Sequence, residues 1–144
     1  MNEDALDQTA VVAILNEILE TELSGVVRYT HYSLMVFGYS RIPIVHWLRS
    51  QATESLAHAY QAGELVTHFG EHPSLAIGPL LETHKHDISD ILKESLEHET
   101  AAVRLYRRLF GLAEGRSILV EDYARQMVAK EEQHIGEVRK MLIG

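Results

Sequence analysis

The chain has 144 residues, 46% of them hydrophobic and 24% charged, which predicts one folded domain over 1–144 rather than a disordered chain. Its formal net charge of -8 excludes the basic surface that nucleic-acid binding requires and favours the binding of cations. Because the sequence contains no cysteine, disulfides, thiolate metal ligands and cysteine nucleophiles are excluded, and a metal site can use only His, Glu and Asp.

Apolar residues recur at helical spacing through most of the chain, and sustained two-residue alternation is absent, so the sequence predicts four long helices and no sheet. The first helix is expected at about 8–37, where Gly38 ends it. A turn that includes Pro43 then leads into a second helix at about 44–69.

The connection at about 70–85 contains two glycines and two prolines and is too long for a hairpin between neighbouring helices, so it is expected to be a crossover. A third helix follows at about 86–114. Gly115 is a plausible left-handed terminator and Ser117 a plausible cap for the fourth helix, at about 117–142. Short, long and short connections predict an up-down pair, a crossover and a second pair.

The N-terminal segment is acidic where a signal peptide requires positive charge, and no apolar run approaches the ~18 residues that span a membrane. We therefore expect a cytoplasmic protein without a membrane segment.

Three of the expected helices carry a glutamate in the middle of an apolar stripe. These residues are Glu22, Glu99 and Glu131, and His134 follows Glu131 one turn later on the same face. An ionised carboxylate inside an apolar bundle costs on the order of several kcal/mol unless it is paired or metal-bound. Each glutamate alone could instead reach water at the edge of its stripe, but together they predict a shared metal cluster.

An internal repeat supports this prediction. Glu22 and Glu99 lie in matching runs of sequence, and each is followed seven residues later by a tyrosine, Tyr29 or Tyr106. Since two helical turns separate each pair, the tyrosines can donate hydrogen bonds toward the carboxylates and orient them. The alternative is that inward tyrosines at this spacing are ordinary core residues.

This pattern resembles that of ferritin-like di-iron proteins, in which two helices each give one Glu and two others each give a Glu-x-x-His pair. Within that class the sequence resembles bacterioferritin over about residues 10–142. The resemblance implies an all-α, ferritin-like four-helix bundle and a ferroxidase site. Its implied iron ligands are Glu22, His58, Glu99, Glu131 and His134.

The sixth ligand of the family, a bridging Glu, falls on Ser55, which cannot replace it. Glu54 is a candidate substitute because it lies about 40° from His58 around the helix axis and can chelate a metal with it. Alternatively, Glu54 forms a surface pair with Arg49 or Arg28. Three carboxylates leave one positive charge of two ferrous ions unbalanced, so a mononuclear or asymmetric site is an alternative to a di-iron site.

Two further departures concern haem and assembly. Leu56 stands where the family has a haem-binding Met, so haem is not expected. The chain ends about ten residues after His134, before the short fifth helix of the storage shell. A homodimer that buries the first two helices is therefore expected, with a 24-subunit cage as the alternative.

The other histidines are expected to have surface or structural roles: His31, His46, His68, His72, His84, His86 and His98. His98 adjoins Glu99 but is expected to point about 100° away from it. The histidines at 68, 72, 84 and 86 bracket the crossover and are a candidate site for an adventitious or entering cation.

The expected function is the oxidation of Fe(II) by dioxygen or peroxide, with storage or detoxification of the product. One alternative is a di-metal oxidase, hydroxylase or peroxide-consuming enzyme on the same bundle. Another is a non-catalytic structural subunit with a degraded site, which the serine at position 55 would explain.

Overall fold

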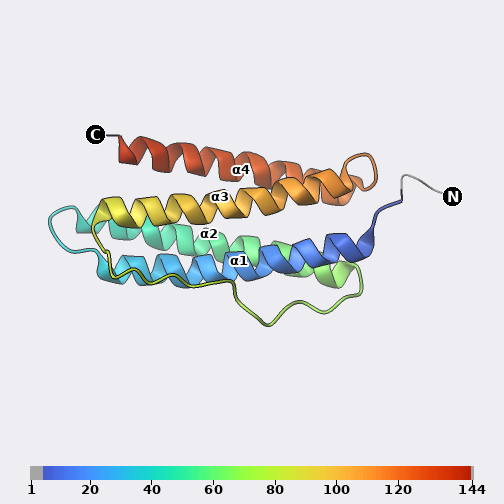
Figure 1. The fold of residues 1–144 in the computed structure, drawn as a ribbon, viewed down its shortest axis with the longest axis horizontal. Helices are drawn as coiled ribbons and strands as arrows, with labels where there is room; N and C mark the ends of the chain where they lie inside the picture. The colour runs from blue at the N-terminus through green and yellow to red at the C-terminus, as the bar shows by residue number, and fades with distance from the viewer. Residues whose placement is uncertain (1–4, 144) are drawn as a thin grey trace.

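The computed structural model describes residues 5–143, so positions 1–4 and 144 of the expected domain lie outside the described residues. The described chain forms four helices and no strand: α1 (Gln8–Met35), α2 (Arg41–His68), α3 (Ile88–Ala113) and α4 (Ile118–Leu142). Figure 1 shows α1 antiparallel to α2 and α3 antiparallel to α4, with a long connection between the two pairs. The prediction of an all-α four-helix bundle is confirmed.

Local signals fix the helix ends. The Asp7 side chain accepts a hydrogen bond from the Ala10 amide at 3.1 Å, and the predicted cap Ser117 accepts one from the Val120 amide at 3.2 Å. Gly38 and Gly115 have φ angles of 103° and 74°, in the left-handed region that glycine adopts at low cost. The predicted ends of the first and third helices are therefore confirmed to within a few residues.

The predicted start of the second helix was wrong. Helix α2 begins at Arg41, so Pro43 lies inside its first turn rather than in the preceding loop. A proline there breaks no hydrogen bond, because the first amides of a helix have no partner within it. The other boundaries differ by one or two residues, with α1 ending at Met35 and α3 beginning at Ile88.

The crossover between α2 and α3 lies along α1 and carries the chain back along the bundle (Figure 1). The Gly78 amide donates to the Glu20 carbonyl oxygen at 2.8 Å. The Ser74 hydroxyl donates to the Glu20 carboxylate at 2.7 Å, and the Ser74 amide donates to the Asn16 side chain at 2.8 Å. These bonds explain how a segment without regular structure keeps one course, and they confirm the predicted crossover.

Helix packing is uneven around the bundle. Helix α1 packs against α2 and α3, and α3 packs against α4, but no Cα atom of α2 lies within 8 Å of a Cα atom of α4. The α2–α4 seam is therefore the widest side of the bundle and is bridged by side chains alone. The Trp47 ring of α2 stacks on the His134 ring of α4 across this seam, with centroids 5.8 Å apart.

The core consists of two apolar clusters, one toward each end of the bundle. In α1, residues from Val11 to Leu19 belong to the first cluster and residues from Tyr29 to Val36 to the second. Glu22 lies between the two clusters along α1, and His58 of α2 contacts it there. None of the four helices is both long and apolar enough to cross a membrane.

Candidate metal centre

Four helices bring one predicted ligand each to the middle of the bundle. Glu22 of α1, His58 of α2, Glu99 of α3 and Glu131 of α4 have exposed fractions of 1%, 6%, 4% and 3%. His134 lies one turn after Glu131 and is largely buried. The expectation that these side chains point inward together is confirmed, and the alternative that each glutamate reaches water at the edge of its stripe is excluded.

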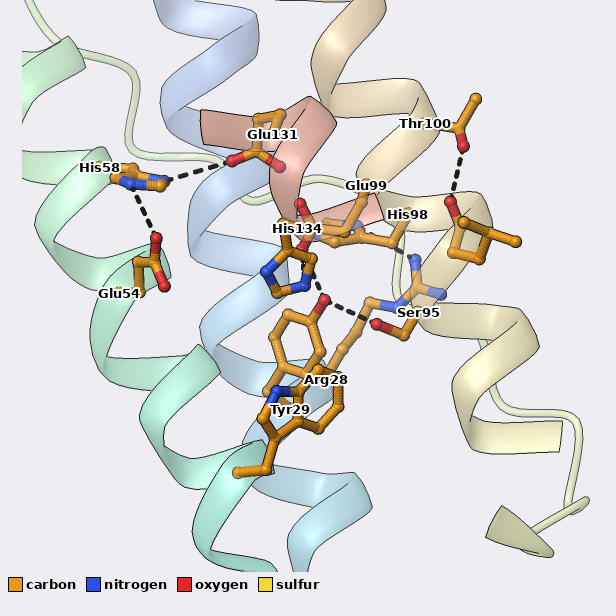
Figure 2. Close-up of polar contacts among 12 residues, drawn as sticks. Arg28, Tyr29, Glu54, His58, Ser95, His98, Glu99, Thr100, Glu131 and His134 are labelled. Carbon is orange, nitrogen blue, oxygen red and sulfur yellow. Dashed lines mark hydrogen bonds and ion pairs between the residues drawn. The ribbon is translucent and has the colours of Figure 1, made fainter. Parts of the chain in front are cut away.

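The acidic and imidazole groups are in direct contact. His58 Nδ1 lies 2.9 Å from Glu22 Oε2 and 3.5 Å from Glu131 Oε1, and one ligand atom from each of the three residues lies within 4.8 Å of the others. On the other side of the cluster, His134 Nε2 lies 3.8 Å from Glu99 Oε1. Figure 2 shows Glu131 facing both His58 and the Glu99–His134 pair.

The two tyrosines of the internal repeat bind the carboxylates crosswise. Tyr29 of α1 donates to Glu99 Oε1 of α3 at 2.5 Å, whereas Tyr106 of α3 donates to Glu22 Oε2 of α1 at 2.7 Å. Ser95 lies 2.8 Å from the Tyr29 hydroxyl and fixes that side further (Figure 2). Both tyrosines therefore orient a carboxylate, as the repeat predicted, but each acts on the glutamate of the other helix.

The three buried glutamates differ in the direction of their pKa shifts. Burial raises the pKa of Glu131 far above its ordinary value, and the neighbouring Glu99 and Glu22 carboxylates raise it further. Burial also raises the pKa of Glu22, against the opposing effect of His58. For Glu99, burial is outweighed by the neighbouring Glu131 carboxyl group and by nearby His134, which together lower its pKa. Glu131 therefore carries a proton near neutral pH, and a cation that binds there would displace it.

Unsatisfied polar atoms test whether these residues fit a metal. Glu131 Oε2 and His134 Nε2 are buried, and neither has a hydrogen-bond partner among residues 5–143. Buried polar atoms are normally satisfied, so such a pair marks a place where a ligand of another kind fits. Carboxylate oxygen and imidazole nitrogen are donors that suit Fe(II), Mn(II) and Zn(II). The donor set therefore fits one or two of these ions.

The two candidates for the sixth ligand lie differently. Ser55 is buried with an exposed fraction of 5%, and it has no carboxylate to offer. The Glu54 side chain is 47% exposed, and its Oε1 lies 3.7 Å from His58 Nε2 (Figure 2), whereas Glu22 contacts the other ring nitrogen, Nδ1. Within the described residues Glu54 pairs with His58 and not with Arg49 or Arg28. Glu54 thus reaches the edge of the cluster rather than its centre.

Of the two roles expected for His98, at the surface or in the structure, the surface role is excluded. Its exposed fraction is 5%, and its ring lies edge-on to Tyr29 with centroids 6.1 Å apart. Burial lowers the pKa of His98 to about 4, so the ring is neutral. Arg28 lies 3.4 Å from Nδ1, and since an arginine can only donate, the ring hydrogen lies on Nε2, which has no partner among residues 5–143.

The sequence carried a signal for this burial in Gly25. A Cβ atom at position 25 would lie 2.8 Å from His98 Nε2 and 3.0 Å from Ser55 Oγ, so only glycine leaves room for both side chains. A glycine inside a helix costs about 1 kcal/mol relative to alanine, which makes it informative when it occurs in the middle of an apolar stripe. The angular offset of His98 from Glu99 does not expose its side chain, because α3 meets α1 on that side.

The predicted cluster of four histidines around the crossover does not form. His68 lies at the end of α2 and His72 just beyond it, whereas His84 and His86 lie next to the start of α3. Figure 1 shows these two helix termini at opposite ends of the bundle. His46, His68, His72 and His84 are exposed, as expected.

The fold and the site together define the class of protein: a four-helix bundle with a carboxylate–imidazole cluster at its centre and a long second connection, the arrangement of di-metal carboxylate proteins. The chain belongs to the ferritin-like family, because the family model described as "Ferritin-like domain" matches residues 12–143. No curated protein matches the sequence.

Solved structures share this fold. A ferritin-like, diiron-carboxylate protein from Bacillus anthracis str. Ames is 21% identical, with a TM-score of 0.88 and 99% of each chain covered. A dodecameric thioferritin, the bacterioferritin-related protein of Bacteroides fragilis, is 20% identical with a TM-score of 0.86 over 95% of this chain and 86% of that one. Rhodobacter capsulatus bacterioferritin is 20% identical, with a TM-score of 0.85 over 93% and 84%. The resemblance expected from the sequence is thereby confirmed at the level of family and fold.

Proposed function

We propose that the chain binds Fe(II) at the centre of the bundle and oxidises it to Fe(III), with dioxygen or peroxide as electron acceptor. The observation that carries this proposal is the convergence of Glu22, His58, Glu99 and Glu131 from four different helices into one buried cluster. The ferritin-like family and the di-iron description of a structural neighbour support iron as the metal.

The proposed site is asymmetric. Ligand atoms of Glu22, His58 and Glu131 already lie within 4.8 Å of one another, so these residues form the position with the higher metal affinity. Glu99 and His134 form the second position, which shares Glu131 with the first. Because only three buried carboxylates face two dications, we expect the second ion to bind more weakly than the first. Glu54 would add charge only at the outer nitrogen of His58.

In the proposed function the two tyrosines orient the carboxylates, and the apolar side chains around the cluster exclude water. Tyr29 donates to one carboxylate oxygen of Glu99, and Tyr106 donates to one carboxylate oxygen of Glu22. The second oxygen of each carboxylate is then free to bind the metal. The apolar clusters on both sides exclude bulk water from the site. Bound iron supplies the electrons, and the residues of the chain fix its geometry and release the proton of Glu131 as the ion enters.

The alternative of an enzyme for an organic substrate is less well supported. The pocket that adjoins Glu22 is lined mainly by apolar side chains, and its volume accessible to a water-sized molecule is about 0 Å³. Sites for small organic molecules occupy about 300 Å³ or more. The space next to Glu22 therefore offers no room for an organic substrate.

The proposal is tested by anaerobic Fe(II) binding followed by exposure to dioxygen. We expect up to two Fe(II) at the centre of each bundle, with unequal affinities, and an absorbance rise from Fe(III) on oxidation. Glu99→Ala should abolish the weaker position and slow oxidation, whereas Glu97→Ala, an exposed glutamate on the same helix, should leave both unchanged. Iron binding that Glu99→Ala does not alter would refute the site.

Assembly and haem belong to the same proposal. Exposed apolar side chains gather on α1 and α2 and on the turn between them, among them Leu34, Phe37 and Ile42. We propose a homodimer through this face, and storage of the oxidised iron if dimers assemble further, as in the dodecameric neighbour. Analytical ultracentrifugation should give a dimer or larger species, and Leu34→Glu should yield monomers. Since Leu56 offers no ligand atom, addition of haemin should produce no stoichiometric Soret band.

A further inference from the structure

A second group of potential metal ligands lies outside the bundle, where the crossover approaches its end. It comprises His31 on α1, Glu82 in the crossover and His86 just before α3. His31 Nε2 lies 2.8 Å from Glu82 Oε2, and His86 Nε2 lies 3.3 Å from Glu82 Oε1. The two imidazole rings lie 5.9 Å apart, so the carboxylate is held between them.

These distances are close to those that a metal requires. Two ligand atoms on a tetrahedral ion, each about 2.1 Å from it, lie about 3.4 Å apart. The three ligand atoms of this cluster lie within 4.8 Å of one another, so an ion can bind with side-chain adjustments of about one ångström. Since the His31 and Glu82 side chains are 43% and 40% exposed, water can complete the coordination.

One nitrogen of this cluster, Nε2 of His86, has no hydrogen-bond partner among residues 5–143. His86 Nε2 is inaccessible to solvent and makes no hydrogen bond with any residue in the range 5–143, although Glu82 is close. The Glu82 carboxylate is oriented by the His84 amide, which donates to Oε1 at 2.6 Å and lowers the pKa of Glu82. An imidazole nitrogen that lies 3.3 Å from a carboxylate oxygen without a hydrogen bond between them is an arrangement that a borderline cation stabilises.

We propose that His31, Glu82 and His86 bind one divalent transition-metal ion, of the zinc or ferrous class, and that this ion clamps the crossover onto α1 and the start of α3. The first half of the crossover is tied to α1 by hydrogen bonds from Ser74 and Gly78. The metal ties its second half. The site shares no residue with the centre of the bundle and does not depend on the proposed oxidation of iron.

The site is tested by zinc titration of chelator-treated protein, monitored by calorimetry. The double variant His31→Ala/His86→Ala should bind one zinc fewer per chain than the wild type. The matched control His46→Ala/His68→Ala, which removes two exposed histidines outside the cluster, should bind as many as the wild type. If the first double variant retains the full complement of zinc, the proposal is wrong.

A conservative variant separates charge from folding. Glu82→Gln keeps the size of the side chain, and it should weaken zinc binding at this site by on the order of tenfold or more, with an unchanged circular dichroism spectrum. In a crystal soaked with zinc, an anomalous peak should lie between the His31 and His86 rings. Absence of that peak, with zinc present at the centre of the bundle, would overturn the proposal.

Hydrogen exchange tests the clamp itself. Zinc should slow amide exchange over residues 79–87 in the wild type and in Glu99→Ala, but not in His31→Ala/His86→Ala. Slowing in the last variant, or none in the wild type, would show that no clamp forms. Since Glu99→Ala tests only the central site, failure of the iron proposal and failure of this one give different results.

Discussion

Replacement of Glu131 by glutamine tests whether this carboxyl holds a proton in the metal-free bundle. Burial, together with Glu99 and Glu22, raises its pKa in the folded chain far above the ordinary value of 4.5. Near neutral pH the folded state therefore binds a proton that the unfolded chain has released. The free energy of unfolding must then fall as pH rises, by about 1.4 kcal/mol per pH unit, and by about 2.7 kcal/mol from about pH 6.5 to about pH 8.5.

Glutamine keeps the volume of the side chain but cannot ionise, so the variant should lack this contribution. His58, whose pKa is raised by the Glu22 hydrogen bond despite burial, contributes a smaller fall of the same sign in both proteins. The assay is urea unfolding of chelator-treated wild type and Glu131→Gln at several pH values. Saturating zinc is the control, because a metal-bound carboxylate is ionised and the wild-type slope should flatten. Equal slopes in the two metal-free proteins would refute the reasoning.

Three further substitutions have defined outcomes. Gly25→Ala should lower the free energy of unfolding in urea by about 1–3 kcal/mol, because the added Cβ would overlap the buried side chains of His98 and Ser55. The control is Gly111→Ala, which has open space around it and should raise the free energy of unfolding by about 0.5–1 kcal/mol. Tyr106→Phe should cost about 1 kcal/mol, because it removes one of the two groups that contact Oε2 of buried Glu22 and leaves only His58, and calorimetry should show weaker binding of the first Fe(II). Ser55→Glu should destabilise the metal-free chain by about 3 kcal/mol and strengthen the second iron position, so a variant that is destabilised but still binds the second ion weakly would contradict the charge argument.

The helices and the buried glutamates were predictable from the sequence because both follow from helical periodicity. An apolar stripe locates the interior, and a charged residue in its middle stands out against it. The crosswise bonds between Tyr29 and Glu99 and between Tyr106 and Glu22 were not predictable, since they depend on which helices pack together. Periodicity describes one helix at a time and says nothing of its neighbour.

Two details of α2 and α3 also could not be predicted from the spacing of apolar residues. Pro43 was read as a helix breaker although its place in the first turn makes it harmless. The angle between His98 and Glu99 left a surface and a structural role open for His98, and the structure shows a buried one because α1 covers that face at Gly25. The cluster of His31, Glu82 and His86 joins residues from distant parts of the chain, so the course of the crossover had to be known first.

The wide seam between α2 and α4 has a consequence for the passage of ions. A fully buried cluster can be loaded only if the protein opens, and each helical pair is closed by tight backbone packing. Between α2 and α4 only side chains meet, among them the stacked rings of Trp47 and His134. Rotation of those rings would uncover the interior without unfolding either hairpin. The Trp47 ring therefore covers, next to His134, the side of the bundle on which no backbone contact joins the two hairpins.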